Sequence, residues 1–301
     1  MPAWLYPAGP AVVRAPSDSA VVLRVPHSVR TFTRAQVTDW FAPPDWHPRS
    51  HPAMPSVVAV GRKPAVFACG YCHLPAGGGR PENAALAGLP ADYMVRQVAD
   101  IRSGVRRTAL ASPYGPWDNM HKVAVAATDD EVRIAAEYFA SLRLPRRVRV
   151  VEGERVPRTY VAGVLRVISP EGGREPIADR IIEVAEDHER FERRDERSGF
   201  IAYVPPGSVA RGRAMARRGV GGAAGCASCH GPALRGGGFA PPIAGRSPSY
   251  LMRQLVAFSS GARSGSESAP MRAMTAGLSN AEMVALAAYV GSIGPRAGAT
   301  R

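Results

Sequence analysis

A five-residue pattern, Cys-x-x-Cys-His, occurs twice in the 301-residue chain, at Cys69–His73 and at Cys226–His230. The two copies are 157 positions apart, and other residues recur at the same offset. All four cysteines of the chain fall in these copies, so none remains for a disulfide. Self-similarity at a fixed offset is the signature of repeated structural units. The further pairs at this offset are Gly88 and Gly245, Tyr93 and Tyr250, Arg96 and Arg253, Gln97 and Gln254, and Gly104 and Gly261.

Beyond Gly104 and Gly261 the offset shortens to 151 residues. Met120 then matches Met271, and Tyr138 matches Tyr289. A loop of the second unit therefore lacks six residues. We expect two like domains, at residues 51–145 and 206–301, with a proline-rich N-terminal extension over 1–50 and a joining segment over 146–205.

Helical signals dominate both units. A middle helix is expected from near Pro90 to Gly104 and from near Pro248 to Gly261. Capping boxes at residues 128–131 and 279–282 each precede an apolar stripe with helical spacing, which predicts a closing helix in each unit. Further helices are expected at about 208–218 and, less clearly marked, at 57–62. The predicted fold class is thus mainly α.

The joining segment differs from the two units. It alternates between apolar and polar residues in places, which predicts a few short strands. At roughly 60 residues it is too long for a plain linker, so we expect it to pack between the domains. The arginines at positions 143–158 are expected to form a solvated surface.

The Cys-x-x-Cys-His pattern is the attachment signature of c-type haem. Its two thiols can add to the two vinyl groups of one porphyrin, and the histidine then lies under the iron. We therefore expect two covalently bound haem c groups. Two alternatives are a redox dithiol and a four-thiolate zinc site, but zinc pairs usually lie about 15–20 residues apart and neither alternative explains the histidines. The predicted residues are Cys69, Cys72, Cys226 and Cys229 for covalent attachment, and His73 and His230 as axial iron ligands.

A second axial ligand is expected from Met120 and Met271, which occupy matched positions just before the capping boxes, in predicted loops. A thioether stabilises ferrous haem iron and suits an electron carrier. His121 is a possible competitor without a counterpart in the second unit. The other candidates lack a matched methionine and are expected in the core: Met94, Met252, Met274 and Met283. The matched Tyr93/Tyr250, Gln97/Gln254 and Arg96/Arg253 pairs either line the haem pockets or serve packing and solvation.

The formal net charge is +13, and two haems with two propionates each would lower it by roughly four. The protein should remain basic, which suits an acidic redox partner or an anionic membrane face; nucleic acid is not the expected partner. No run of about 18 apolar residues predicts a transmembrane segment. No secretory signal is visible in the first 30 residues, yet c-type haem is attached outside the bacterial cytoplasm. We therefore expect a periplasmic protein whose start is truncated or already mature.

With these residues in place, the chain resembles bacterial di-haem class I cytochromes of the cytochrome c4 type. The likeness rests on the two haem motifs, on Met120 and Met271, and on closing sequences at 136–142 (AEYFASL) and 287–293 (AAYVGSI). The resemblance implies two tandem helical haem domains, each with His/Met iron. The 1–50 and 146–205 segments depart from that pattern.

The resemblance implies a periplasmic carrier that transfers single electrons between respiratory partners. A quinol-oxidising complex or dehydrogenase would be the donor, and an oxidase or reductase the acceptor. The two filled irons favour electron transfer over catalysis, so we expect a protein that is not an enzyme. The alternatives are an electron-accepting subunit of a dehydrogenase complex and a di-haem enzyme of the thiosulfate dehydrogenase or peroxidase kind.

Overall fold

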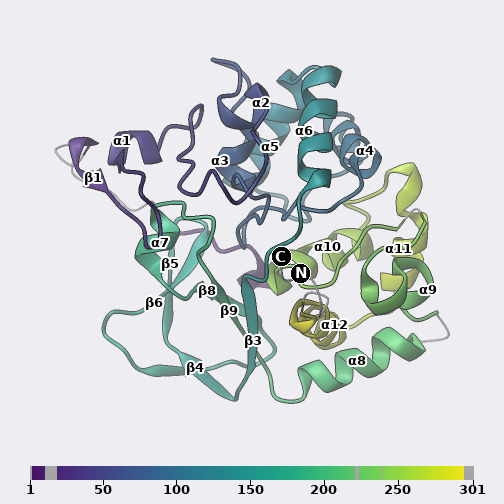
Figure 1. Ribbon diagram of the computed structural model, residues 1–301. Coiled ribbons are helices and arrows are strands. Elements are labelled where there is room, and N and C mark those ends of the chain that lie inside the picture. The colour runs from purple at the N-terminus through teal and green to yellow at the C-terminus, as the bar shows by residue number, and fades with distance from the viewer. Residues whose placement is uncertain (1, 11–18, 221–223, 239, 295–301) are drawn as a thin grey trace.

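The computed structural model describes residues 2–10, 19–220, 224–238 and 240–294. Figure 1 shows a first helical unit at the top, a second helical unit at the lower right, and the strands of the joining segment at the lower left. About 40% of the structure is helical, in line with the predicted mainly α character, but it contains more strand than two helical domains alone would have. The first unit contains α2 (Ser56–Ala59), α3 (Cys69–His73), α4 (Ala91–Arg102), α5 (Gly115–Ala126) and α6 (Asp129–Ser141); the second contains α8 (Ser208–Arg218), α9 (Ala227–His230), α10 (Pro248–Ser259), α11 (Ala269–Thr275) and α12 (Asn280–Ser292).

The closing helices α6 and α12 begin where the sequence predicts. Thr128 accepts a hydrogen bond from the backbone of Glu131, whose side chain accepts one in return. Ser279 and Glu282 form the same reciprocal pair. These boxes satisfy amide groups that the first turn leaves unpaired.

The second unit also contains two short 3-10 turns, η3 (Pro232–Leu234) and η4 (Ser266–Ser268).

The methionine segments are helices, so the prediction that Met120 and Met271 lie in loops is wrong. Met120 lies in α5 and Met271 in α11. Each helix has a proline in its first turn, Pro116 and Pro270, where the missing amide proton costs nothing and the fixed φ suits the helix. The two prolines were the local signal for these helices.

Helices α8 and α12 cross at very short range in the second unit. A Cβ atom added to Gly212 of α8 would lie 1.9 Å from the carbonyl oxygen of Ala285 in α12. Only glycine therefore allows the two backbones to approach this closely. The crossing helps to build a core that includes Met252, Met283 and Val284.

The joining segment forms a three-stranded sheet and two small strand pairs, which confirms the predicted strands. In the sheet, β3 (Val148–Glu152) runs parallel to β9 (Phe200–Val204), and β8 (Ile182–Ala185) pairs antiparallel with β9. Buried and less buried residues alternate along β9, as expected for a strand with one covered face. Val148, Ala202 and Val204 join the core of the second unit, so the segment is part of that unit's packing. The other elements are β4 (Arg155–Pro157) with β7 (Arg174–Pro176), β5 (Thr159–Ala162) with β6 (Leu165–Ile168), and helix α7 (His188–Glu192).

The N-terminal extension has two separate anchors. Residues of and next to its first turn, η1 (Ala3–Leu5), pack in the core of the second unit, where Leu5 is 1% exposed. Residues 19–50 form β1 (Val22–Leu23), β2 (Phe32–Thr33) and α1 (Arg34–Val37) around a small core with Trp46. The indole nitrogen of Trp46 donates to the carbonyl of Arg193 at 2.8 Å, which ties the extension to the joining segment.

One arginine of the predicted solvated cluster is buried. Arg147 donates to the carbonyl oxygens of Ser198 and Gly79, both at 2.8 Å, and its guanidinium lies over the ring of Phe200. It thus links the joining segment to the loop after the first cysteine motif.

In the described part of the chain, no helix has the length and apolar character needed to cross a membrane.

Candidate functional site: two cysteine–histidine motifs around one cavity

Each Cys-x-x-Cys-His motif folds as one short helical turn. Cys69 and Cys72 lie in α3, and Cys226 caps the N-terminus of α9, which contains Cys229. A spacing of three residues places both sulfur atoms of a pair on one side of the turn. This is the arrangement that two bonds to one porphyrin require.

Burial changes the chemistry of the thiols as free groups. It raises the pKa of Cys69 to about 12, and it raises the pKa of Cys72 and Cys226. A redox dithiol needs a thiolate at neutral pH, so these thiols are poorly suited to that role. Within the described residues the cysteines also form no group of three or more close ligand atoms, which argues against a four-thiolate zinc site.

The two motif histidines have the same second contact. Nδ1 of His73 lies 2.8 Å from the carbonyl oxygen of Ala84, and Nδ1 of His230 lies 2.8 Å from that of Pro241. Because a carbonyl only accepts, Nδ1 carries the proton and the lone pair of Nε2 is left for a metal. Burial lowers the pKa of both histidines, which favours the neutral form that ligates iron.

One cavity of about 430 Å³ is lined by both motifs. Met120 and Met271 line it too, whereas the exposed His121 is not among its lining residues. The structure therefore brings every predicted site residue to the same cavity. Met94, Met252 and Met283 lie in the hydrophobic cores, as predicted, and Met94 also lines the cavity.

Met274 departs from its predicted core position. It lies one helical turn after Met271 in α11, is partly exposed, and lines the same cavity. The second unit thus has two methionine thioethers at the cavity, those of Met271 and Met274. Only Met271 has a matched methionine in the first unit.

A reciprocal polar network lies between the two motifs. Arg106 of the first unit donates to Tyr250 and Gln254 of the second, at 3.1 and 3.3 Å. Arg263 of the second unit donates to Gln97 and Tyr93 of the first, at 2.6 and 3.4 Å. The backbones of the two arginines pair as an antiparallel bridge. The network relates the two units to each other nearly symmetrically.

This network holds buried positive charge. Burial and the charge of Arg106 lower the pKa of Arg263. Burial also lowers the pKa of Arg246, which is outside the network but whose charge acts on Tyr93, to about 10. Burial raises the pKa of Tyr93, but the charges of Arg263 and Arg106 outweigh it and lower that pKa overall. In the described residues, none of these three guanidinium groups forms an ion pair with a carboxylate.

The lining fits covalently held haem. It offers paired thiols, a histidine with a free Nε2 beside each pair, an apolar wall, and buried guanidinium groups that need anionic partners. Haem propionates are anions of the required charge. The cysteines and histidines would hold the haems, and the arginines would neutralise the propionates.

The sequence-based prediction did not include Arg106 and Arg263 as site residues. They too are 157 residues apart, and they lie just before the offset shortens. Tyr93, Gln97, Tyr250 and Gln254 line the cavity, which is one of the two roles expected of them. Arg96 and Arg253 line it as well; Arg96 also pairs with Asp92, whereas Arg253 is buried. The repeat identifies candidate pairs but not which of them face the cavity.

Comparisons with known proteins agree with this chemistry. The family model for cytochrome c matches residues 216–294. A "thiosulfate dehydrogenase electron acceptor" of Stutzerimonas stutzeri is 27% identical over 242 residues, which cover 78% of this chain and 83% of the relative. The solved thiosulfate dehydrogenase (TsdBA) of Marichromatium purpuratum is 26% identical with a TM-score of 0.51, and covers 79% of this chain. This chain spans only 39% of that protein's length. Cytochrome c4 of Pseudomonas stutzeri is 22% identical with a TM-score of 0.49, over 75% of this chain and 93% of that one.

The comparisons correct one expectation. The sequence predicted a protein that is not an enzyme, but similar proteins include a thiosulfate dehydrogenase as well as an electron acceptor of one. Matched methionines were therefore too weak a basis for excluding catalysis, because even as iron ligands they would not determine which reactions the protein takes part in.

The second unit carries the family match, the cysteine pair and the buried histidine together. Residues 216–294 therefore match the cytochrome c family, whose members bind haem c covalently and transfer electrons.

Proposed function

We propose that the protein is a periplasmic di-haem cytochrome that accepts electrons from a thiosulfate-oxidising enzyme and passes them to a respiratory acceptor. The single cavity lined by both Cys-x-x-Cys-His motifs carries this proposal. Two redox centres that share one cavity can exchange electrons within the chain, while each can also serve a different partner.

The residues of each unit have distinct roles in this proposal. Cys69 and Cys72 hold the first haem, with His73 and Met120 as its axial ligands. The second haem is held in the same way by Cys226, Cys229, His230 and Met271. Haem iron, when bound, supplies reversible one-electron oxidation and reduction. The chain contributes the tautomer of each histidine, an apolar lining that excludes water, and the charge of Arg106 and Arg263.

The choice of donor rests on the similarity to the electron acceptor from S. stutzeri. The aligned region covers most of both chains. A chain with a net charge of +13 suits an acidic docking surface, because complementary charge speeds encounter between redox proteins. Export to the periplasm follows from the haem type, since c-type haem is attached outside the bacterial cytoplasm.

A second candidate is thiosulfate oxidation by the chain itself. The similarity to the M. purpuratum enzyme favours it. The presence of Met274 beside Met271 favours it too, because an iron with two possible sixth ligands can exchange them and open a position for substrate.

Haem reduction by thiosulfate separates the two candidates. The oxidised, haem-loaded protein is mixed with thiosulfate alone, and then with thiosulfate and a purified thiosulfate dehydrogenase, while haem absorbance is followed. For an electron acceptor we expect rapid reduction only when the dehydrogenase is present. Rapid reduction by thiosulfate alone, coupled to its oxidation product, would establish the second candidate in place of the first.

A control with a different reductant completes the experiment. Ascorbate should reduce both haems in every preparation, which shows that the irons are competent. A protein that ascorbate reduces but that neither thiosulfate mixture reduces would contradict both candidates.

A further inference from the structure

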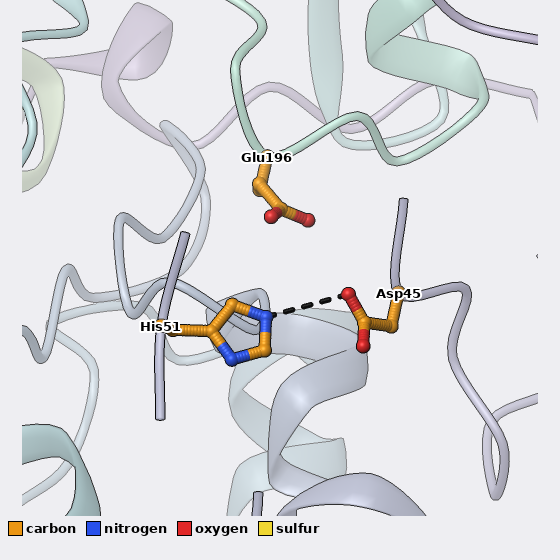
Figure 2. A group of neighbouring side chains, drawn as sticks. All are labelled: Asp45, His51 and Glu196. Atoms are coloured by element: carbon orange, nitrogen blue, oxygen red, sulfur yellow. Dashed lines mark hydrogen bonds and ion pairs between the residues drawn. The ribbon is translucent and has the colours of Figure 1, made fainter. Parts of the chain in front are cut away.

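A compact group of ligand atoms lies outside the haem site. Asp45 comes from the N-terminal extension, His51 is the first residue after it, and Glu196 comes from the joining segment. One ligand atom from each lies within 4.8 Å of the others. Figure 2 shows the carboxylate of Glu196 directed toward the space beside the His51 ring and the Asp45 carboxylate. Two segments that the repeat leaves unexplained therefore meet at this group.

The hydrogen bonds of His51 fix its proton. Nδ1 lies 2.9 Å from the carbonyl oxygen of Pro52, which can only accept, so Nδ1 is protonated. In the neutral ring Nε2 then presents a lone pair, and it faces Oδ1 of Asp45 at 3.3 Å. This contact is attractive only when Nε2 carries a proton or when the two atoms bind one cation. The side chain of His51 is only 2% exposed, so solvent water does not readily separate the two groups.

Glu196 provides an independent indication. The residue is 3% exposed, and its Oε1 accepts from Ser50 Oγ at 3.0 Å. Its Oε2 is buried without a hydrogen-bond partner in the structure. A buried carboxylate oxygen without a partner is costly, and coordination of a cation is one of the ways that proteins avoid the cost.

The surrounding charges leave the group short of positive charge. Arg30 is the cation paired with Asp45, but it lies 3.6 Å from the other oxygen, Oδ2, and its side chain is 47% exposed. The neighbouring Asp195 is already paired with His47 and Arg190. With both carboxylates ionised and the imidazole neutral, the group would carry a local charge of about −2, which one divalent cation would neutralise.

We propose that Asp45, His51 and Glu196 bind one divalent transition-metal ion, with Zn²⁺ the best match, and that this ion clips the N-terminal extension to the joining segment. One imidazole nitrogen and two carboxylate oxygens are ligands that zinc accepts at about 2.0–2.2 Å. Tetrahedral ligands at that distance from the metal are about 3.3 Å apart, which matches the separation of Nε2 and Oδ1. A water molecule would complete the coordination.

The site lies against the first helical unit. The ring of His51 packs edge-on to Tyr138 of α6, with centroids 6.4 Å apart, and the Tyr138 hydroxyl donates to the carbonyl of Pro75 just after the first motif. A bound ion would stabilise the contact of the extension and the joining segment with the unit that carries Cys69–His73. It would act as a structural ion, separate from the haem irons.

Calorimetric titration of the haem-loaded protein with Zn²⁺, after treatment with EDTA, tests the proposal. In the loaded protein the four cysteines are thioethers and do not compete for zinc. We expect one ion per chain, a higher midpoint of thermal unfolding with zinc, and an unchanged haem spectrum. X-ray absorption at the zinc edge should report nitrogen and oxygen ligands without sulfur.

Matched variants locate the site. Glu196→Gln and His51→Gln should each weaken binding at least about 100-fold, because removing a ligand costs at least as much as removing an outer contact. Glu171→Gln and His27→Gln, at exposed positions, should bind as the parent protein does. Asp45→Asn at the more exposed ligand provides a further test if Glu196→Gln fails to fold.

Three results would overturn the proposal. They are the absence of stoichiometric binding, sulfur among the zinc ligands, and full binding by both Glu196→Gln and Asp45→Asn. The first of these would assign the group to a shared proton in place of a metal. None of these results tests electron transfer from thiosulfate dehydrogenase, so the metal site and the proposed function are tested independently of each other.

Discussion

The buried histidines show how single contacts set the chemistry of the site. His73 and His230 each give one ring nitrogen to a carbonyl oxygen 11 residues further along, so the other nitrogen of each ring keeps its lone pair. This second contact orients the ring and raises its basicity toward a metal. The chain thus orients His73 and His230 in the same way. The candidate sixth ligands of the two units differ, because Met274 lies at the cavity beside Met271.

Methionine substitutions distinguish those ligands. Met120→Ala and Met271→Ala should each remove about half of the methionine-to-ferric-iron absorbance band, and each should lower one reduction potential, because a thioether stabilises ferrous iron. The spectrum and a redox titration of each variant provide the measurement. Met274→Ala is the control and should leave the band intact. Loss of the band in Met274→Ala but not in Met271→Ala would exchange the two assignments.

The central arginines should raise the haem potentials. A positive charge near the iron favours the reduced state, so Arg106→Gln or Arg263→Gln should lower a potential, by about 60 mV if the lost interaction is about 1.4 kcal/mol. Spectroelectrochemical titration measures this shift. The exposed Arg272→Gln should leave both potentials where they are. Potentials that rise or stay constant in Arg106→Gln and Arg263→Gln would show that the two charges do not act on the haems.

Secondary elements depend on close approaches that single residues permit. Helices α8 and α12 cross at Gly212, where even a methyl group would meet backbone atoms. Backbone cannot rotate away as a side chain does, so any larger residue must displace a helix.

Gly212→Ala should therefore lower the free energy of unfolding by about 1–3 kcal/mol, despite the better helix propensity of alanine, which returns at most about 1 kcal/mol. Denaturant unfolding of the haem-loaded protein measures the effect. Gly277→Ala is the matched control, because nothing lies within 4 Å of the added atom and its φ is not positive. Equal stability of the two variants would contradict the close crossing.

The contact between β8 and α10 should depend on pH. Glu183 accepts from Ser247 Oγ at 2.7 Å and from the amide of Ser249 at 2.9 Å. Burial raises the pKa of Glu183, and these hydrogen bonds lower it only in part. The folded state therefore keeps a proton that the unfolded chain has lost, so the stability from this group is present below about pH 4.5 and is lost as the pH rises through the folded pKa.

Glu183→Gln should flatten this fall in the free energy of unfolding above about pH 4.5. Unfolding curves at a series of pH values measure the slope. The exposed Glu186→Gln should keep the slope of the parent protein. A Glu183→Gln protein with the parental slope would show that other groups dominate the pH dependence.

At the scale of the whole molecule, the segments outside the repeat hold the two units together. Leu5 and Tyr6 enter the core of the second unit, Trp46 bonds to the joining segment, and Arg147 of that segment bonds to the loop at Gly79. Arg246 adds a direct link, because its Nη2 donates to the carbonyl of Ala87 in the first unit at 3.1 Å. The extra segments thus form part of one packed structure (Figure 1).

Leu5→Ala should destabilise the molecule by about 2–5 kcal/mol, as expected for a fully buried leucine, even though residue 5 lies far from the second unit in the sequence. Thermal or denaturant unfolding checks this. Val29→Ala in the same extension should have little effect, since Val29 is 100% exposed. An extension that hangs free of the molecule would give no loss for either variant.

Much of the site was predictable because its signals are local. Haem attachment needs two thiols and a histidine within five residues, and the capping boxes at Thr128 and Ser279 lie within four residues of their partners. The repeat then doubled each observation. These features predicted the middle and closing helices and the strands between the units; the assignment of the cysteines and histidines to haem stays a prediction.

Only the tertiary structure decided how these pieces meet. Four features depend on residues that are distant in the chain. Both motifs line one cavity, and Met274 lines it too. Arg106 and Arg263 each donate to side chains of the other unit, and Asp45, His51 and Glu196 lie close together. No local pattern encodes such contacts, because they arise when separate elements bury their apolar faces against each other. The sequence by itself thus determined the two Cys-x-x-Cys-His motifs and the helices that carry them, because these depend on neighbouring residues, and the packing determined what lies between and around the motifs.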